Sequence, residues 1–188
     1  DHPAFHGWYI APENCFSSSG IVEVYRRYSA LMKELAPEKP VLISPWYPSN
    51  VYEQLSKQDR HERFQEDWER IFTEAPAIDI AAFQDGSCTW KPIEQPATYE
   101  LEDYIREIAE VTRRHKVELW NNAETFARNM PIKFPPIDWR LLKRKMEICD
   151  PHVEKHITFE FSHFMSLNSM YPSARTLYDR YREEILKK

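Results

Sequence analysis

The stretch Val117-Glu118-Leu119-Trp120-Asn121-Asn122-Ala123-Glu124 carries the strongest fold signal in this chain. It has the length of a β-strand, and successive side chains of a strand point to opposite faces. Val117 and Leu119 share one face, whereas the other face collects Glu118, Trp120, Asn122 and Glu124. A strand with one aliphatic face and one mixed polar face, ending on a carboxylate, is typical of a β/α barrel, whose functional residues gather at the C-terminal strand ends.

Four more strand-like segments surround this one, at about residues 5–11, 41–44, 78–83 and 157–162. A helical pattern follows each of the five segments, at about residues 21–35, 64–72, 101–111, 138–149 and 173–185, and Thr98, Asp138 and Ser173 are predicted N-caps of the last three. Five β-then-α units in series predict a parallel sheet with right-handed crossovers.

The strand faces distinguish two kinds of α/β fold. A doubly wound sheet buries both faces under helices and reads as apolar throughout. Here the aliphatic faces are expected to pack against helices, while the mixed faces point inward and carry Ser44 and Trp46, Ala81, Phe83 and Asp85, and Glu160 and Ser162. We therefore predict an α/β fold of the (β/α)8 TIM-barrel type.

A full barrel typically takes about 250 residues, whereas this chain has 188. We expect residues 1–188 to form a single, partial or truncated barrel domain that supplies about five β/α units, the last five of eight. The missing strands are expected to come from an absent N-terminal segment or from another chain. The start at Asp1, directly before a strand and without a visible signal peptide, fits a mature or truncated form.

Composition excludes several classes of function. The net charge of −5 and the absence of a basic stripe argue against a nucleic-acid partner. The 3 glycines cannot build a phosphate-binding loop, and no apolar run is long enough to span a membrane. Cys15, Cys88 and Cys149 are odd in number and lack zinc-site spacing, so a disulfide framework is not expected.

Two glutamates stand at strand ends three units apart. If the five strands are the last five of eight, Glu13 follows the fourth strand and Glu124 follows the seventh. This placement resembles a superfamily of retaining barrel glycosidases, in which the acid/base glutamate follows strand four and the nucleophile follows strand seven. Retaining hydrolysis requires two carboxyl groups about 5–5.5 Å apart. The chain departs from that superfamily at Pro12, where an Asn usually precedes the acid.

A series of local motifs points to a narrower resemblance. The motifs are Gly7-Trp8-Tyr9-Ile10 with Glu13, Ile43-Ser44-Pro45-Trp46-Tyr47, Phe83-Gln84-Asp85-Gly86, Leu119 to Phe126, and Phe159 to Met165. In this order they resemble a bacterial domain family of unknown function, described as a glycoside-hydrolase-like barrel and common in gut-type Bacteroidetes. The resemblance implies the barrel and a carbohydrate-linked, extracytoplasmic setting, which is periplasmic, cell-surface or secreted.

Further polar and aromatic residues are expected at the barrel mouth as substrate-binding residues: Tyr9, Trp46, Tyr47, Gln84, Asp85, Trp120, Asn122, Ser162 and His163. Aromatic rings could stack on sugar rings or simply pack the mouth. Asp85 could bind sugar hydroxyls or serve as a turn residue before Gly86, and Glu160 fits a buried structural carboxylate best. A Ser162–His163 hydrolase is disfavoured, because neighbours in one strand point apart.

Three functions remain open from the sequence. The leading hypothesis is a glycoside hydrolase for an oligo- or polysaccharide, with Glu13 as acid/base, Glu124 as nucleophile, and no metal or organic cofactor. The alternative is a non-catalytic carbohydrate-binding barrel. The third is a metal-dependent sugar-active barrel, in which Glu13, Asp85, Glu124 and His163 would converge on an ion.

Overall fold

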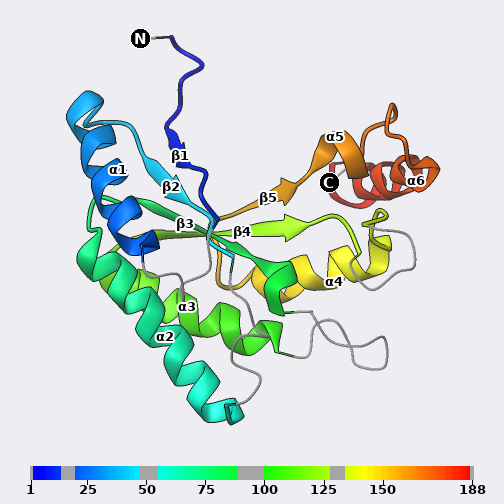
Figure 1. Cartoon of the computed structure of the whole chain (residues 1–188). Coiled ribbons are helices and arrows are strands. Elements are labelled where there is room, and N and C mark those ends of the chain that lie inside the picture. Colours follow the sequence, from blue (N-terminus) through cyan, green and yellow to red (C-terminus); the bar gives the residue numbers. More distant parts are fainter. Residues whose placement is uncertain (1, 14–19, 47–54, 89–99, 128–133, 187–188) are drawn as a thin grey trace.

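The computed structural model describes residues 2–13, 20–46, 55–88, 100–127 and 134–186. Its centre is a five-stranded parallel sheet in which the strands follow one another in sequence order (Figure 1). The strands are β1 (Trp8–Ile10), β2 (Val41–Ile43), β3 (Ile80–Gln84), β4 (Glu118–Glu124) and β5 (Lys155–Phe159). The fold is α/β and of the TIM-barrel type, as predicted.

Each strand is followed by a helix; the helices after the first four strands lie on one side of the sheet, whereas those after the fifth strand lie beyond its C-terminal end (Figure 1). They are α1 (Ile21–Leu35), α2 (Lys57–Glu74), α3 (Leu101–His115), α4 (Trp139–Cys149), the short α5 (Phe161–Phe164) and α6 (Pro172–Tyr181), with a 3-10 turn η2 (Asp85–Cys88) after β3 and a π-helical turn η3 (Arg182–Leu186) after α6. No helix in the described part of the chain is long and apolar enough to cross a membrane.

The helix starts agree with the sequence in part. Asp138 caps α4 as predicted, because its Oδ1 accepts a hydrogen bond of 2.8 Å from the backbone N–H of Arg140. The prediction for Ser173 is wrong: α6 has Tyr171 as its N-cap and Pro172 at the first helical position, where the fixed φ of proline suits a helix start. The N-cap of α3 is Glu100, and Thr98 lies outside the described residues.

The main hydrophobic core lies between the sheet and helices α1 to α3. Val41 and Ile43 of β2, Ala81 and Phe83 of β3 and Leu119 of β4 pack there against aromatic and aliphatic side chains of the helices, among them Phe64, Trp68, Tyr104 and Ile108. These side chains are almost completely withdrawn from water. The opposite, inner face carries a smaller cluster of Ile80, Ala82 and Trp120, with Leu42 and Ile157 packed against it.

These contacts correct the predicted direction of two strands. For β2 and β4 the faces are as predicted, but in β3 Ala81 and Phe83 pack under the helices, while Ile80 and Ala82 lie on the inner face. In β5, Ile157 pairs in register with Asn122, so it shares the inner face with it. In β3 the physical reason is that both faces of the strand are buried, so apolar side chains occupy the inner face as well. In β5 both faces are partly exposed, so burial does not distinguish them.

Candidate functional site

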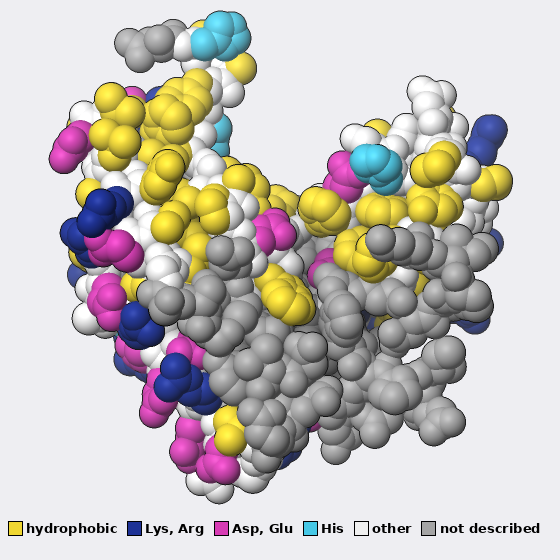
Figure 2. Space-filling model, viewed as in Figure 1, with side chains coloured by type: hydrophobic (Ala, Val, Ile, Leu, Met, Phe, Trp, Pro, Cys, Tyr) yellow, Lys and Arg dark blue, Asp and Glu magenta, His cyan; other side chains and the backbone are white. Residues whose placement is uncertain are grey.

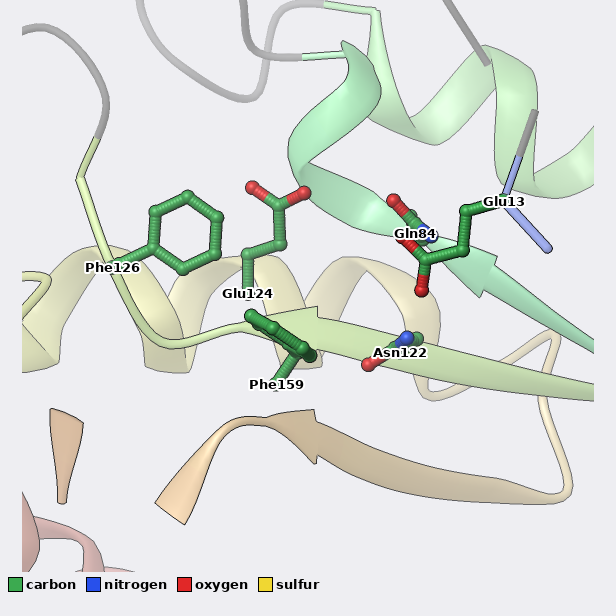
Figure 3. Close-up of a pocket in the computed structure, with 6 residues that line it drawn as sticks. All are labelled: Glu13, Gln84, Asn122, Glu124, Phe126 and Phe159. Carbon is green, nitrogen blue, oxygen red and sulfur yellow. The ribbon is translucent and has the colours of Figure 1, made fainter. Parts of the chain in front are cut away.

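A small pocket opens at the C-terminal edge of the sheet (Figure 3). Its described lining consists of Glu13, Gln84, Asn122, Glu124, Phe126 and Phe159. The cavity itself is small, about 60 Å³, well below the roughly 300 Å³ at which small-molecule sites begin. The structure therefore brings the two predicted glutamates together with two amides and two aromatic rings, at the edge where barrel enzymes keep their functional groups.

The molecular surface also has a larger hollow. Figure 2 shows this hollow between the part of the molecule that holds β1 and α1 and the part that holds α5 and α6, with hydrophobic side chains on both walls. Among the exposed apolar residues are Tyr9 of β1, Phe159 at the end of β5 and Phe161 at the start of α5. A ligand longer than the pocket can therefore extend along aromatic surface.

Glu124 is the last residue of β4, and its side chain is buried. Its carboxylate lies directly against Gly86: a Cβ added to this glycine would come within 1.7 Å of Glu124 Oε2. Real Cβ atoms do not approach another heavy atom so closely, because van der Waals contact begins at about 3.5 Å. The absence of a side chain at position 86 therefore makes the space in which the Glu124 carboxylate sits.

Glu13 lies three residues beyond β1 and is exposed. The hydroxyl of Tyr9 donates a hydrogen bond of 3.0 Å to Glu13 Oε1. Burial, followed by the negative charge of Glu13 and this hydrogen bond, raises the pKa of Tyr9 above its ordinary value, so the phenol stays a donor. The segment is also anchored to α1, because the Tyr25 hydroxyl donates to the carbonyl oxygen of Pro12 at 3.0 Å.

Ser44 connects the two amides of the pocket. Its carbonyl oxygen accepts from Gln84 Nε2 at 2.8 Å, and its Oγ accepts from Asn122 Nδ2 at 3.0 Å while donating to the carbonyl oxygen of Ala82 at 2.8 Å. Both amide NH₂ groups are thus used inside the protein, which leaves the amide oxygens as acceptors for a ligand. The sequence placed Ser44 on the inner face but gave no sign of this role.

Two aromatic residues of the pocket, Phe126 and Phe159, were missed by the sequence analysis. Their ring centroids lie 6.1 Å apart in an edge-to-face arrangement, and Phe159 is about half exposed. Phe159 pairs in register with Glu124, so its ring stands beside the carboxylate on the same face. The signal that could have found it is the alternation within β5, which was interpreted in the opposite direction.

Three predicted aromatic residues lie elsewhere or outside the described residues. Trp46 is half-buried two residues beyond Ser44 and is not part of the described pocket lining. Tyr47 lies outside the described residues. Trp120 lies two residues before Asn122 on the inner face, where its ring lies 4.2 Å from Lys155 Nζ and its Nε1 donates to Glu118 at 3.1 Å. It lines a different cavity, with His6 and Pro40.

Ser162 and His163 do not belong to a strand, which corrects the predicted fifth segment. They lie in the short helix α5, because β5 ends at Phe159. His163 Nδ1 contacts the carboxylate of Glu160, and the His163 side chain is largely exposed. In the described lining of the pocket, neither Ser162 nor His163 is present.

Asp85 is completely buried below the pocket rather than at its mouth. Its Oδ1 lies 2.6 Å from Lys145 Nζ and accepts the backbone N–H of Glu124 at 3.0 Å, while its Oδ2 accepts from Asn121 Nδ2 at 3.3 Å. The carboxylate is therefore occupied by protein partners. The sequence assigned Asp85 to the substrate, and it could not reveal Lys145, which lies 60 residues away.

The four residues of the metal hypothesis do not converge. Asp85 pairs with Lys145, and His163 contacts Glu160, whereas Glu13 and Glu124 line the pocket. Within the described ranges, no group of three or more His, Cys, Asp or Glu side chains is arranged to hold a metal ion.

Solved structures resemble this chain in fold. A crystal structure from Bacteroides thetaiotaomicron, described as that of "a putative alpha-L-fucosidase", has a TM-score of 0.84 and 34% identity, and covers 97% of this chain and 57% of its own. The β-D-glucuronidase of Dictyoglomus thermophilum has a TM-score of 0.54 at 15% identity, over 94% of this chain and 31% of its own, and shows a likeness of fold alone. This chain thus spans little more than half the length of the first of these proteins.

A family model covers nearly the whole chain. It matches residues 1–174 and is described as "Domain of unknown function (DUF4434)". No curated protein matches the chain significantly. The match includes all five strands and both glutamates of the pocket, and agrees with the motif series. The chain therefore belongs to the DUF4434 domain family.

Proposed function

We propose that this domain belongs to a glycoside hydrolase that cleaves an oligo- or polysaccharide by a retaining, two-carboxylate mechanism. The observation that supports it most is that Glu13 and Glu124, from the ends of strands three units apart, line one pocket with Gln84 and Asn122. A sugar presents hydroxyl donors to such acceptors and C–H faces to rings such as Phe126 and Phe159.

The proposed reaction has two steps. In the first, the Glu124 carboxylate attacks the anomeric carbon, the bond from that carbon to the leaving oxygen breaks, and Glu13 gives its proton to the leaving oxygen. In the second, Glu13 takes a proton from a water whose oxygen attacks the anomeric carbon, and the bond to Glu124 breaks. The sugar leaves with its original anomeric configuration, and both carboxyl groups return to their starting states.

The surroundings of the two glutamates support this division of roles. Glu124 is buried and seated against Gly86, as suits a nucleophile that must meet one carbon atom in a fixed direction. Glu13 is exposed and held by the Tyr9 hydroxyl. An exposed residue suits the acid/base, since the leaving group and then water must reach it.

The pocket chemistry favours a neutral sugar. The described lining holds two carboxylates, two amides and two rings, and no cationic side chain is among these residues. A uronic acid would bring a further negative charge to these carboxylates, which is unfavourable at short range. The relative described as a putative α-L-fucosidase makes α-L-fucosides the first substrates to test.

The test is turnover of a panel of 4-nitrophenyl glycosides, with α-L-fucoside and glucuronide included. We expect Glu124→Gln to lose kcat by several orders of magnitude with little change in substrate affinity. Glu13→Ala should retain activity on substrates with good leaving groups, and added azide should restore its rate and yield a glycosyl azide. Glu118→Gln, at the opposite end of β4 from Glu124, is the matched control and should behave as the wild type.

Two results would contradict the proposal. Full activity of Glu124→Gln would exclude this residue as the nucleophile. Sugar binding without turnover by the wild type, with affinity retained in Glu124→Gln, would favour the non-catalytic carbohydrate-binding barrel. The extracytoplasmic location and the source of the remaining barrel strands stay predictions.

A further inference from the structure

A buried ion pair lies directly behind Glu124. Lys145 of α4 and Asp85 of η2 have side chains that are 2% and 0% exposed, and Lys145 Nζ lies 2.6 Å from Asp85 Oδ1. A buried ion pair contributes little net stability, because removing two charges from water offsets most of their attraction. The role of this ion pair is therefore expected to be something other than stabilising the fold.

The pair holds both backbone polar groups of Glu124. Asp85 Oδ1 accepts the Glu124 N–H at 3.0 Å, and Lys145 Nζ donates to the Glu124 carbonyl oxygen at 3.1 Å. The register of β3 and β4 ends at Gln84 and Asn122, so β3 offers no further ladder partner to Glu124. The side chain of Asp85 thus replaces a strand carbonyl at the point where β3 turns into η2.

A second layer fixes the orientation of Asp85. Asn121 Nδ2 lies 3.3 Å from Asp85 Oδ2 and 3.1 Å from His156 Nδ1, and His156 Nε2 lies 2.7 Å from Asp150 Oδ1. Since Asn121 donates to both neighbours, His156 Nδ1 accepts and His156 Nε2–H donates to Asp150. Among the described residues, Asn121 Oδ1 is buried and has no hydrogen-bond partner, which lowers stability.

We propose that Asp85 and Lys145 are positioning residues that clamp the backbone of Glu124, so that its carboxylate enters the pocket in one direction. Gly86, the residue after Asp85, completes the arrangement because it leaves room for that carboxylate. Two adjacent residues of η2 therefore act on Glu124: Asp85 accepts its backbone N–H, and Gly86 leaves the space that its carboxylate occupies. The catalytic part of this inference rests on the proposed function.

The test compares a double variant of the ion pair with a control variant on α4. Lys145→Met combined with Asp85→Asn removes both buried charges at nearly constant volume, and leaves residue 85 with a neutral amide oxygen, which accepts the Glu124 N–H more weakly than the carboxylate does. Lys143→Met is the matched control, since Lys143 is on the same helix but pairs with Glu184 in a partly exposed bridge. Circular dichroism and thermal unfolding verify that each variant is folded.

Two readouts decide the inference. In the double variant we expect kcat to fall by about a hundredfold with KM changed by less than about threefold, because a misplaced reacting group affects the transition state more than binding. We also expect the Glu124 amide to exchange its hydrogen at least about tenfold faster, with the Leu119 amide unchanged. Lys143→Met should leave all these quantities at wild-type values. A folded double variant with wild-type kcat, or with wild-type exchange at Glu124, would overturn the proposal.

Hydrogen exchange also tests the clamp if the double variant does not fold or if the wild type has no activity. If the double variant does not fold, the wild type decides: the clamp requires the Glu124 amide to exchange as slowly as that of Leu119, although Glu124 ends its strand. Exchange at the rate of a frayed strand end would refute the clamp. If the wild type shows no turnover, the proposed function fails, and the clamp is judged by hydrogen exchange alone.

Discussion

Gly86→Ala tests whether the seat of the Glu124 carboxylate matters for activity. The added Cβ would lie 1.7 Å from Glu124 Oε2 and 2.0 Å from its Cδ. Since contact requires about 3.5 Å, the carboxylate must retreat by nearly 2 Å. The atoms that must move are the far end of a flexible side chain, so the fold can accommodate the methyl group with a loss of less than about 1 kcal/mol in unfolding free energy.

The expected loss of activity is much larger than the loss of stability. A displacement of about 1 Å can cost about a hundredfold in rate, which corresponds to about 2.7 kcal/mol of transition-state stabilisation. We therefore expect Gly86→Ala to lose at least this much in kcat/KM while its Tm changes by a few degrees. Gly20→Ala is the matched control, because a Cβ at this glycine meets nothing within 4 Å.

The assay is hydrolysis of the best 4-nitrophenyl glycoside, with thermal unfolding measured on the same preparations. A double-mutant cycle with Glu124→Gln adds a sharper criterion: if Gly86→Ala acts through the carboxylate, it should slow the Glu124→Gln variant no further. A folded Gly86→Ala protein with kcat/KM within about threefold of the wild type would refute the reasoning. An undiminished effect of Gly86→Ala in the Glu124→Gln background would show that the glycine acts by another route.

Three further predictions concern titrating groups. Burial raises the pKa of Tyr25 above its unfolded value of about 10. The contribution of Tyr25 to stability is therefore complete below pH 10 and declines above it by about 1.4 kcal/mol per pH unit. In urea unfolding, Tyr25→Phe should reduce the loss of stability at alkaline pH, whereas Tyr28→Phe, at an exposed position, should not. Burial also raises the pKa of the Cys149 thiol, so iodoacetamide at pH 8 should modify this residue only after unfolding, and rapid native labelling located by mass spectrometry would contradict this. Hydrogen bonds from Arg26 and Arg27 lower the pKa of Glu23 to about 2. The stabilising contribution of Glu23 is therefore fully present above about pH 4.3 and is lost as the pH falls through 2. An NMR titration in which the Glu23 carboxyl has its midpoint near about pH 4.3 would disprove the pairing.

The sequence predicted the order of the elements well, because each element has a local cause. The helix at residues 21–35 has the bounds of α1, since an apolar face repeats at helical spacing until the chain reaches Pro37. Asp138 caps α4 through a hydrogen bond to a residue two positions away. Ser162 and His163 were misassigned, because a short apolar run with aromatic residues fits a strand or a helical turn equally well.

The site was predictable only in outline. Glu13 and Glu124 were found because each ends a strand-like segment, and strand ends meet at one edge of a parallel sheet. Phe126 and Phe159 were missed because an aromatic residue beside a strand looks the same in sequence whether it packs the core or lines a pocket. Ser44 was not recognised as the connection between Gln84 and Asn122, since its partners lie on two other strands.

By itself the sequence determined the β/α alternation, the parallel sheet and the two glutamates at strand ends, because hydrophobic periodicity and strand termination are local properties. Only the tertiary structure decided which face of β3 and β5 points inward, since β3 is buried on both faces and β5 is partly exposed on both, so the alternation of residue types does not tell the two faces apart. It also decided the role of Asp85, which turns away from the pocket because a buried carboxylate requires compensation. That compensation comes from Lys145, 60 residues along the chain, which only the folded protein brings within 2.6 Å.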